Sequence, residues 1–199
     1  MRSTGAIVLV VVVLVVGFAG CAGCGTYNSL QVQDESVTGA WAEVENQYQR
    51  RAAIVEQVVP TIRAQADFES ETLQNVIEAR QQVTNIELDA DDLNDPAAVA
   101  RFEQAQTALA ASLGSLINVV REDYPELQAN EAYLRFQDQL EGNENRIATA
   151  RRDYNRAVTD LNGRIRTFPT SLVAGIAGVD RRELFEAEAG AEETPEIDL

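Results

Sequence analysis

Apolar side chains recur at steps of three and four residues over most of this chain, and this spacing constrains the fold more than any other feature. It is clearest between about Glu126 and Arg166, where we predict one long helix. The predicted apolar stripe comprises Phe136, Leu140, Ile147, Ala150, Tyr154, Val158, Leu161, Ile165 and Phe168. The steps are interrupted once, at Asn143, and Phe168-Pro169 should end the helix, because proline restricts the residue before it.

A second helix is predicted from about Pro96 to Glu122. Its stripe comprises Phe102, Ala105, Leu109, Leu113, Leu116 and Val120. Asp95 should cap this helix, because aspartate accepts hydrogen bonds from the first free amides and proline suits the first helical position. Tyr124-Pro125 should close the segment.

The first part of the soluble chain, from about Val37 to Ile86, also has a helical period. Its stripe comprises Trp41, Val44, Tyr48, Val55, Val58, Ile62, Leu73, Val76 and Val83. Pro60 falls inside the pattern and should kink this helix or divide it in two. Long helices joined by short turns fold back on one another, so we predict an all-α fold: an antiparallel bundle of three or four long helices over residues 37–186.

The N-terminus, residues 1–24, is predicted to be a membrane leader or anchor. Its unbroken aliphatic run fits a cleaved secretory signal, a retained spanning helix or a lipoprotein leader. We favour lipidation, at Cys21 before Cys24, because an apolar residue and two small ones precede Cys21; pairing of the two cysteines is a weaker alternative. Each interpretation places residues 25–36 as a linker and the bundle on the extracytoplasmic side.

The charge balance excludes some partners. The chain has 32 acidic residues against 16 basic ones, all of them arginine, and a net charge of −16. A surface this acidic repels phosphate backbones, so we expect no nucleic-acid binding. Loss of lysine fits a GC-rich genome or adaptation to high salt, and we favour the latter. The acidic end, residues 187–199, is expected to be disordered.

Few catalytic side chains are present. The chain has no histidine, its cysteines lie only in the N-terminal segment, and its one methionine is Met1. This composition disfavours histidine bases, nucleophilic triads and zinc sites, so we expect no enzyme, no cofactor and no metal. Aspartates at 89, 91, 92 and 95 resemble a calcium loop, but Leu93, Asn94 and Ala100 stand where its ligands and glycine belong, which favours an interhelical loop.

A polar cluster follows the seam of the last long helix. Its members are Glu144, Asn145, Arg146, Arg151, Tyr154 and Asn155. They could form a surface for a ligand or partner, or they could pair with neighbouring helices and fix helix register. We favour the structural role for the cluster, and salt bridging for Arg50-Arg51.

Several short motifs follow one another along the chain in the order found in one protein family. They include Tyr27-Asn28-Ser29-Leu30, Ala40-Trp41-Ala42, Tyr124-Pro125-Glu126-Leu127, Glu144-Asn145-Arg146-Ile147 and Tyr154-Asn155. With these motifs the chain resembles the LemA family of bacterial and archaeal envelope proteins over roughly residues 27–186. The resemblance implies a helical bundle tied to the membrane by its N-terminus, with no attributed enzymatic activity. Val55-Glu56-Gln57 replaces the family's Ile-Pro-Asn, and Pro60 follows one helical turn later.

These features predict a non-enzymatic, membrane-anchored scaffold that binds an unidentified envelope protein. The alternative is a carrier of a small molecule or lipid in a bundle cavity. A hydrolase using glutamates such as Glu122, Glu126 and Glu131 is the least favoured hypothesis, since it needs a clustered pair of buried glutamates in a cleft.

Overall fold

The computed structural model describes residues 2–64, 70–89 and 91–185. For residues 2–22 it describes the backbone, with the side chains of Leu9 and Val13 alone. The side chain of the predicted lipidation site Cys21, most other side chains of the predicted anchor 1–24 and the acidic tail 187–199 therefore lie outside what the structure describes. Within the described ranges all regular secondary structure is helical, which confirms the predicted all-α class.

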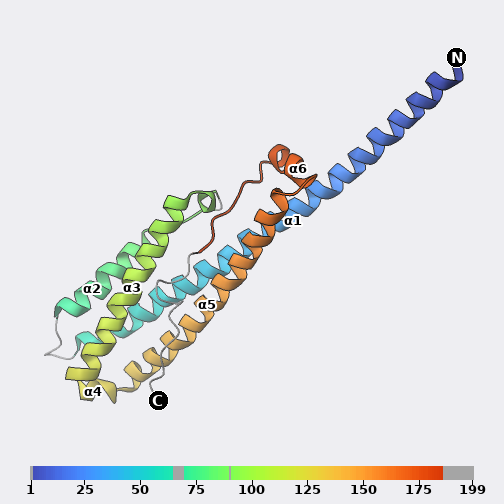
Figure 1. Cartoon of the computed structure of the whole chain (residues 1–199). Coiled ribbons are helices and arrows are strands. Elements are labelled where there is room, and N and C mark those ends of the chain that lie inside the picture. The colour runs from blue at the N-terminus through green and yellow to red at the C-terminus, as the bar shows by residue number, and fades with distance from the viewer. Residues whose placement is uncertain (1, 65–69, 90, 186–199) are drawn as a thin grey trace, which may run out of the picture.

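The helices form an elongated bundle (Figure 1). Their bounds are α1 Arg2–Arg63, α2 Ser70–Thr84, the short 3-10 helix η1 Asp92–Asn94, α3 Pro96–Asp123, α4 Pro125–Gln128, α5 Glu131–Ile165 and α6 Thr170–Ala177. Helix α5 lies antiparallel along α1, while α2 and α3 form a second pair at the end away from the N-terminus (Figure 1). Helix α6 packs on α1 where α1 leaves the bundle (Figure 1).

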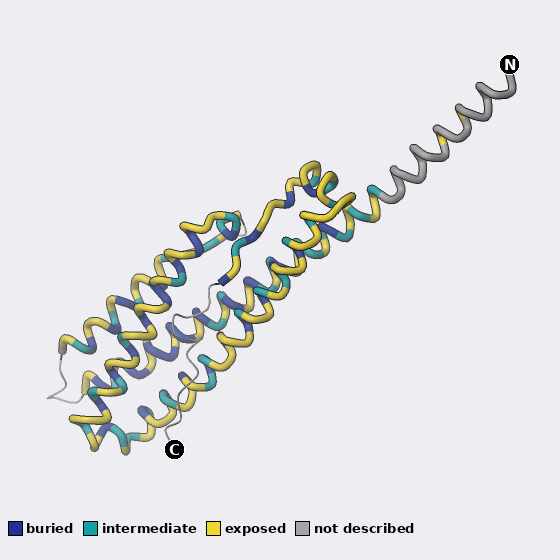
Figure 2. Tube along the Cα trace, in the orientation of Figure 1, coloured by how far each residue is buried: buried dark blue, intermediate teal, exposed yellow. Residues whose placement is uncertain are grey.

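The predicted stripes meet in two apolar clusters, and buried residues line the facing sides of the helices (Figure 2). The distal cluster joins the end of α1 to α2, α3, α4 and the start of α5. The proximal cluster joins the middle of α1 to the rest of α5 and to α6. Trp41 and Tyr48 of α1 both meet the ring of Phe102 edge-on, with centroids 5.3 Å apart, so these aromatics belong to the core as their spacing predicted.

Helix α3 begins as predicted. The Asp95 carboxylate accepts a hydrogen bond from the Ala97 amide at 2.9 Å, and Pro96 occupies the first turn. The single helix expected from Glu126 to Arg166 is wrong at its start. The chain forms the short α4, breaks at Ala129, and restarts as α5 because the Asn130 side chain caps the amides of Ala132 and Tyr133.

Two other details differ from expectation. Helix α1 continues through Pro60 to Arg63, so the division of the first segment comes after the proline. Proline at position 60 removes the amide that would bond to the Glu56 oxygen, and the helix ends within one turn of it, at Arg63. Phe168, the last member of the predicted stripe, is 81% exposed, because α5 has already ended at Ile165 and the helical spacing no longer applies.

Residues 25–36, expected as a linker, lie within α1, and Leu30 is buried in the proximal cluster. Within the described residues, no helix combines the length and apolarity that a membrane crossing requires. Helix α6 was not foreseen. It ends at Gly178, whose φ of 68° is the left-handed conformation that glycine adopts readily, while Val179 donates back to the Ala174 oxygen at 3.2 Å.

Candidate functional site

The predicted polar cluster on α5 faces α1 and α3 in part, and its central contact is with Arg51 of α1. The Arg51 side chain is 5% exposed, and its Nε donates to Glu144 Oε1 at 2.8 Å, with a second bond to the other carboxylate oxygen. A further nitrogen donates to the Gln106 backbone oxygen in α3 at 3.4 Å. Arg51 therefore ties three helices together, which confirms the salt-bridging role, whereas its neighbour Arg50 is exposed.

Arg151 makes the second interhelical contact. Its guanidinium lies 3.5 Å from Glu103 of α3, and both side chains are about one-fifth exposed. The same guanidinium lies over the ring of Phe185, 4.9 Å from the centroid. Such a cation–π contact helps to hold the guanidinium in position beside Glu103.

Tyr154 and Asn155 hold an extended segment that follows α6, residues 179–185, which we call the C-terminal strap. The Tyr154 hydroxyl donates to the Glu183 backbone oxygen at 3.0 Å. Asn155 binds both backbone groups of Phe185: its amide donates to the oxygen at 3.1 Å and its oxygen accepts from the nitrogen at 2.9 Å. The strap is therefore bound through its backbone, like a peptide in a groove.

Asn162, two helical turns beyond Asn155, repeats this contact with Arg182. Its amide donates to the Arg182 oxygen at 2.8 Å and its oxygen accepts from the Arg182 nitrogen at 3.0 Å. The sequence analysis missed Asn162. Its spacing of seven residues from Asn155, which places both on one helix face, was the available signal.

Arg182 is the other residue that sequence did not single out. Its side chain is 7% exposed and donates to Asp34 of α1 at 2.9 Å and to Asn94 of η1 at 3.0 Å. It joins the strap to two elements that are far apart in sequence. Nothing in the local sequence around Arg182 distinguishes it from its exposed neighbour Arg181.

The remaining members of the predicted cluster do not join these contacts. Asn145 and Arg146 lie exposed on α5. The gap in the apolar stripe is filled instead by Asn143, which is fully buried and donates to the Gln47 backbone oxygen of α1 at 3.0 Å. Four of the six predicted residues are thus brought into contact with other elements, and two are on the surface.

The aspartate loop is organised by its own hydrogen bonds. The Asp92 carboxylate accepts from the Asp89 amide at 2.9 Å, Asp95 caps α3, and Asn94 receives Arg182. These contacts explain the loop as a link between α2 and α3. In the ranges that the structure describes, no three histidine, cysteine, aspartate or glutamate residues gather as metal ligands would. Cys24 is exposed on α1.

Burial changes the acidity of three tyrosines. Desolvation raises the pKa of Tyr154 to about 12, opposed by the nearby charge of Arg182. Burial likewise raises the pKa of Tyr48, against the lowering effect of Arg151 and Arg51, and it raises that of Tyr133. These hydroxyls therefore stay protonated at neutral pH and act as hydrogen-bond donors or core groups.

The glutamates considered for hydrolysis do not form a buried pair. Glu122, Glu126 and Glu131 are exposed near the distal end of the bundle, while Glu144 pairs with Arg51. Two shallow hollows, of about 310 and 380 Å³, lie on either side of Arg164 at the proximal end. Hydroxyl, amide and charged groups line most of both hollows.

The model of the LemA family matches residues 40–199. Protein LemA of Metamycoplasma hominis is 25% identical over 166 residues, which is 82% of this chain and 70% of that protein. Magnetosome proteins MamQ 1 and MamQ 2 of Paramagnetospirillum magneticum are each 41% identical over 86 residues, or 43% of this chain. The match spans 31% of those two proteins, so it covers less than a third of their length.

Proposed function

Because the chain belongs to the LemA family, we propose that it is a non-enzymatic scaffold of the cell envelope that binds a protein partner. In this proposal the N-terminal segment anchors the chain in the membrane, by a spanning helix or by lipid at Cys21, and the bundle stands on the extracytoplasmic side. The aliphatic run of residues 6–16 supports the anchor. The absence of histidine from the whole chain supports a role without a histidine general base.

The observation that carries the proposal is that three arginines of the bundle pair with carboxylates on other elements. Arg51, Arg151 and Arg182 each pair with a carboxylate on another element, and together they join α1, α3, α5 and the strap. The guanidiniums of Arg51 and Arg182 are buried, so removing their carboxylate partners would leave uncompensated charges in the interior, which favours the observed pairing of helix faces. The charged groups of the interior therefore hold a bundle of defined shape, as a scaffold requires.

Helix α1 adds a second feature that suits a tethered scaffold. It is one helix of 62 residues that begins at Arg2 and ends in the distal part of the bundle. At about 1.5 Å per residue such a helix links the anchor to the bundle without a flexible joint. The polar lining of the two hollows beside Arg164 gives no support to the alternative of a lipid carrier.

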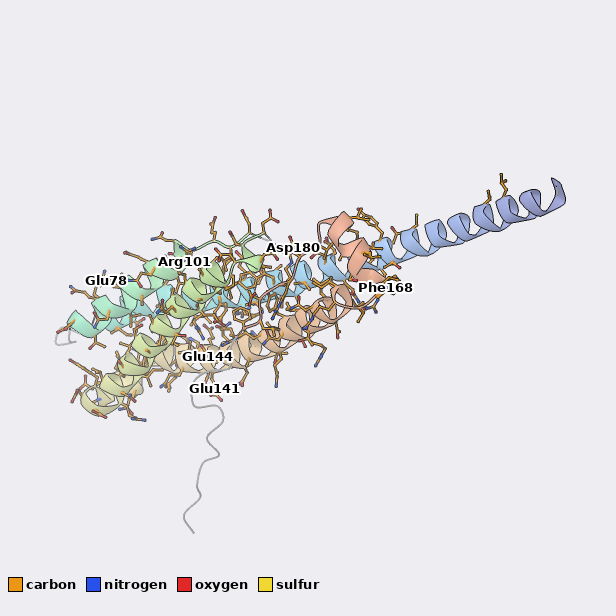
Figure 3. The ribbon with its side chains drawn as sticks, turned by 45° about the horizontal axis from the view of Figure 1, so that its top comes forward. Glu78, Arg101, Glu141, Glu144, Phe168 and Asp180 are labelled. Atoms are coloured by element: carbon orange, nitrogen blue, oxygen red, sulfur yellow. The ribbon has the colours of Figure 1, made fainter. Side chains whose placement is uncertain are left out.

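The test places a photo-reactive amino acid at four exposed positions: Glu78, Arg101, Glu141 and Asp180, which come from α2, α3, α5 and the strap (Figure 3). Each full-length variant is expressed in native membranes, and its presence there is verified before irradiation. One face should crosslink reproducibly to the same envelope protein, while the other positions serve as matched controls. Equal, weak labelling from all four positions of a membrane-bound chain would argue against a protein partner.

A further inference from the structure

The exposed large hydrophobic side chains are concentrated at one end of the molecule. In the described part of the chain they are Leu9, Val13, Tyr27, Val32, Leu134, Phe168, Leu172, Ile176 and Leu184. All but Leu134 and Leu184 belong either to α1 before residue 33 or to the segment 168–176 that contains α6. Contiguous exposed apolar surface in a folded protein marks a place where something binds.

Helix α6 carries the clearest part of this surface. Phe168 precedes it, and Leu172 and Ile176 follow at successive steps of four residues, with 81%, 64% and 86% of their surface exposed. The opposite side of the helix packs on the bundle through the buried Ala174 and the half-buried Val173 and Ala177. The exposed stripe therefore lies on the side of α6 opposite its contact with the bundle. Figure 2 shows exposed positions alternating with less exposed ones along α6.

The stripe lies at the level where α1 departs from the bundle. Thr170, at the start of α6, lines a hollow together with Gly25, Thr26 and Leu30 of α1. Thr26 follows the apolar N-terminal segment, which ends at Ala22, by four residues, or about 6 Å of helix. Phe168 projects beside this part of α1 (Figure 3).

The local charge is also unlike that of the rest of the chain. Residues 24–33 and 161–179, which lie on the bundle side of the anchor, contain Arg164 and Arg166 and no acidic residue, although the whole chain has a net charge of −16. An anionic lipid surface repels the body of the bundle, but at this end it meets arginines. Long arginine side chains can reach headgroups while neighbouring apolar groups enter the lipid.

We propose that α6 lies on the bilayer surface beside the anchor, with Phe168, Leu172 and Ile176 inserted at the boundary between headgroups and acyl chains. The occupant of this apolar face is lipid. The inference rests on the proposed membrane anchor and extends it, since α6 would give the bundle a second contact with the membrane and so a fixed tilt. Interfacial helices bury one apolar face at the boundary between headgroups and acyl chains in this way, with basic residues near the headgroups.

The test uses the full-length chain in vesicles of phosphatidylcholine and phosphatidylglycerol, with or without bromine on the acyl chains. Bromine quenches only tryptophan that reaches the lipid. The native Trp41 is 4% exposed in the proximal cluster and supplies the baseline. In Leu172→Trp, brominated lipid should reduce the added fluorescence by about twofold or more. Leu134→Trp, an exposed leucine at the distal end of α5, is the matched control and should not be quenched.

Ile176→Trp, on the same face, repeats the measurement independently of any disturbance at Leu172 and should be quenched too. If the chain floats with the vesicles but neither tryptophan is quenched, the inference is wrong while the anchor stands. A blue-shifted but unquenched emission would mean that a second copy of the chain covers the stripe, which also overturns it. If the chain does not float with the vesicles, the proposed anchoring itself fails.

Discussion

Asn143 of α5 donates its side-chain amide to the backbone oxygen of Gln47 in α1, at 3.0 Å, at the single interruption of the apolar seam. The Asn143 side chain is fully buried, and its own oxygen has no hydrogen-bond donor facing it. A buried asparagine in a helical seam lowers stability but favours one register over others, because other registers leave its amide unpaired.

Replacing Asn143 with leucine should raise the free energy of unfolding by roughly 1 kcal/mol, because an apolar side chain of similar size removes the unpaired buried oxygen. The Gln47 backbone oxygen loses this donor, but it lies within α1, where backbone oxygens also accept intrahelical hydrogen bonds. Denaturant unfolding of the folded chain measures the change. Asn145→Leu, on the exposed side of α5, is the matched control and should change stability by less than about 0.5 kcal/mol. A marked loss of stability in Asn143→Leu would show that the hydrogen bond outweighs the burial cost.

The Arg51–Glu144 pair should respond unequally to removal of its partners. Glu144→Ala leaves the guanidinium of Arg51, 5% exposed, without a counter-charge and should cost about 3 kcal/mol. Arg51→Met leaves Glu144, 44% exposed, free to meet water and should cost about 1 kcal/mol.

The same unfolding experiment checks this asymmetry. Glu131→Ala removes an exposed partner of Arg135 within α5 and should cost less than about 0.5 kcal/mol. Equal losses in Glu144→Ala and Arg51→Met would mean that burial of the guanidinium does not decide the energetics of the pair.

The C-terminal strap should open when its anchoring ring is removed. Phe185 stacks on Trp41, with centroids 5.7 Å apart, and meets Tyr154 edge-on. Phe185→Ala should lower the local free energy of opening and accelerate tryptic cleavage at Arg181 and Arg182 by about tenfold or more. Leu184→Ala changes an adjacent side chain that is 40% exposed and should leave the cleavage rate nearly unchanged. Similar rates in both variants would contradict the role of Phe185 as the anchor.

Alkaline pH should destabilise the bundle in a defined window. Because the folded state raises the pKa of Tyr154 from 10.0 to about 12, its contribution is complete below pH 10.0 and is lost as pH rises toward about 12. In that window the unfolded chain releases the Tyr154 proton while the folded chain keeps it. The free energy of unfolding therefore falls by up to about 1.4 kcal/mol per pH unit. The chain contains no lysine, which would otherwise titrate in the same range.

Denaturant unfolding at successive pH values measures this slope. Tyr154→Phe should lose about 1 kcal/mol at neutral pH with the bond to Glu183, but should show a shallower decline above pH 10.0. A variant with the same alkaline slope as the parent would show that Tyr154 is not the group responsible.

Much of the candidate site could be anticipated from the spacing along α5, because residues three, four or seven apart lie near one helix face. Spacings of three and four indicated Arg151 with Tyr154 and Arg151 with Asn155, and the spacing of seven applies to Asn155 and Asn162. It could not indicate the strap that they hold. The strap has no periodic pattern, and its contacts to Asp34 and Asn94 depend on how the whole bundle closes.

The sequence by itself determined that this chain forms helices, where α3 begins, and which faces of α1, α3 and α5 are buried. Those properties follow from local periodicity and capping, which act within a few turns. Only the tertiary structure decided that Asn143 fills the seam, that Arg51 and not Arg50 is buried, and that Phe168 is exposed while Phe185 lies in the core. Each of these depends on the opposing helix or strap, since burial is a property of the partner surface as much as of the residue.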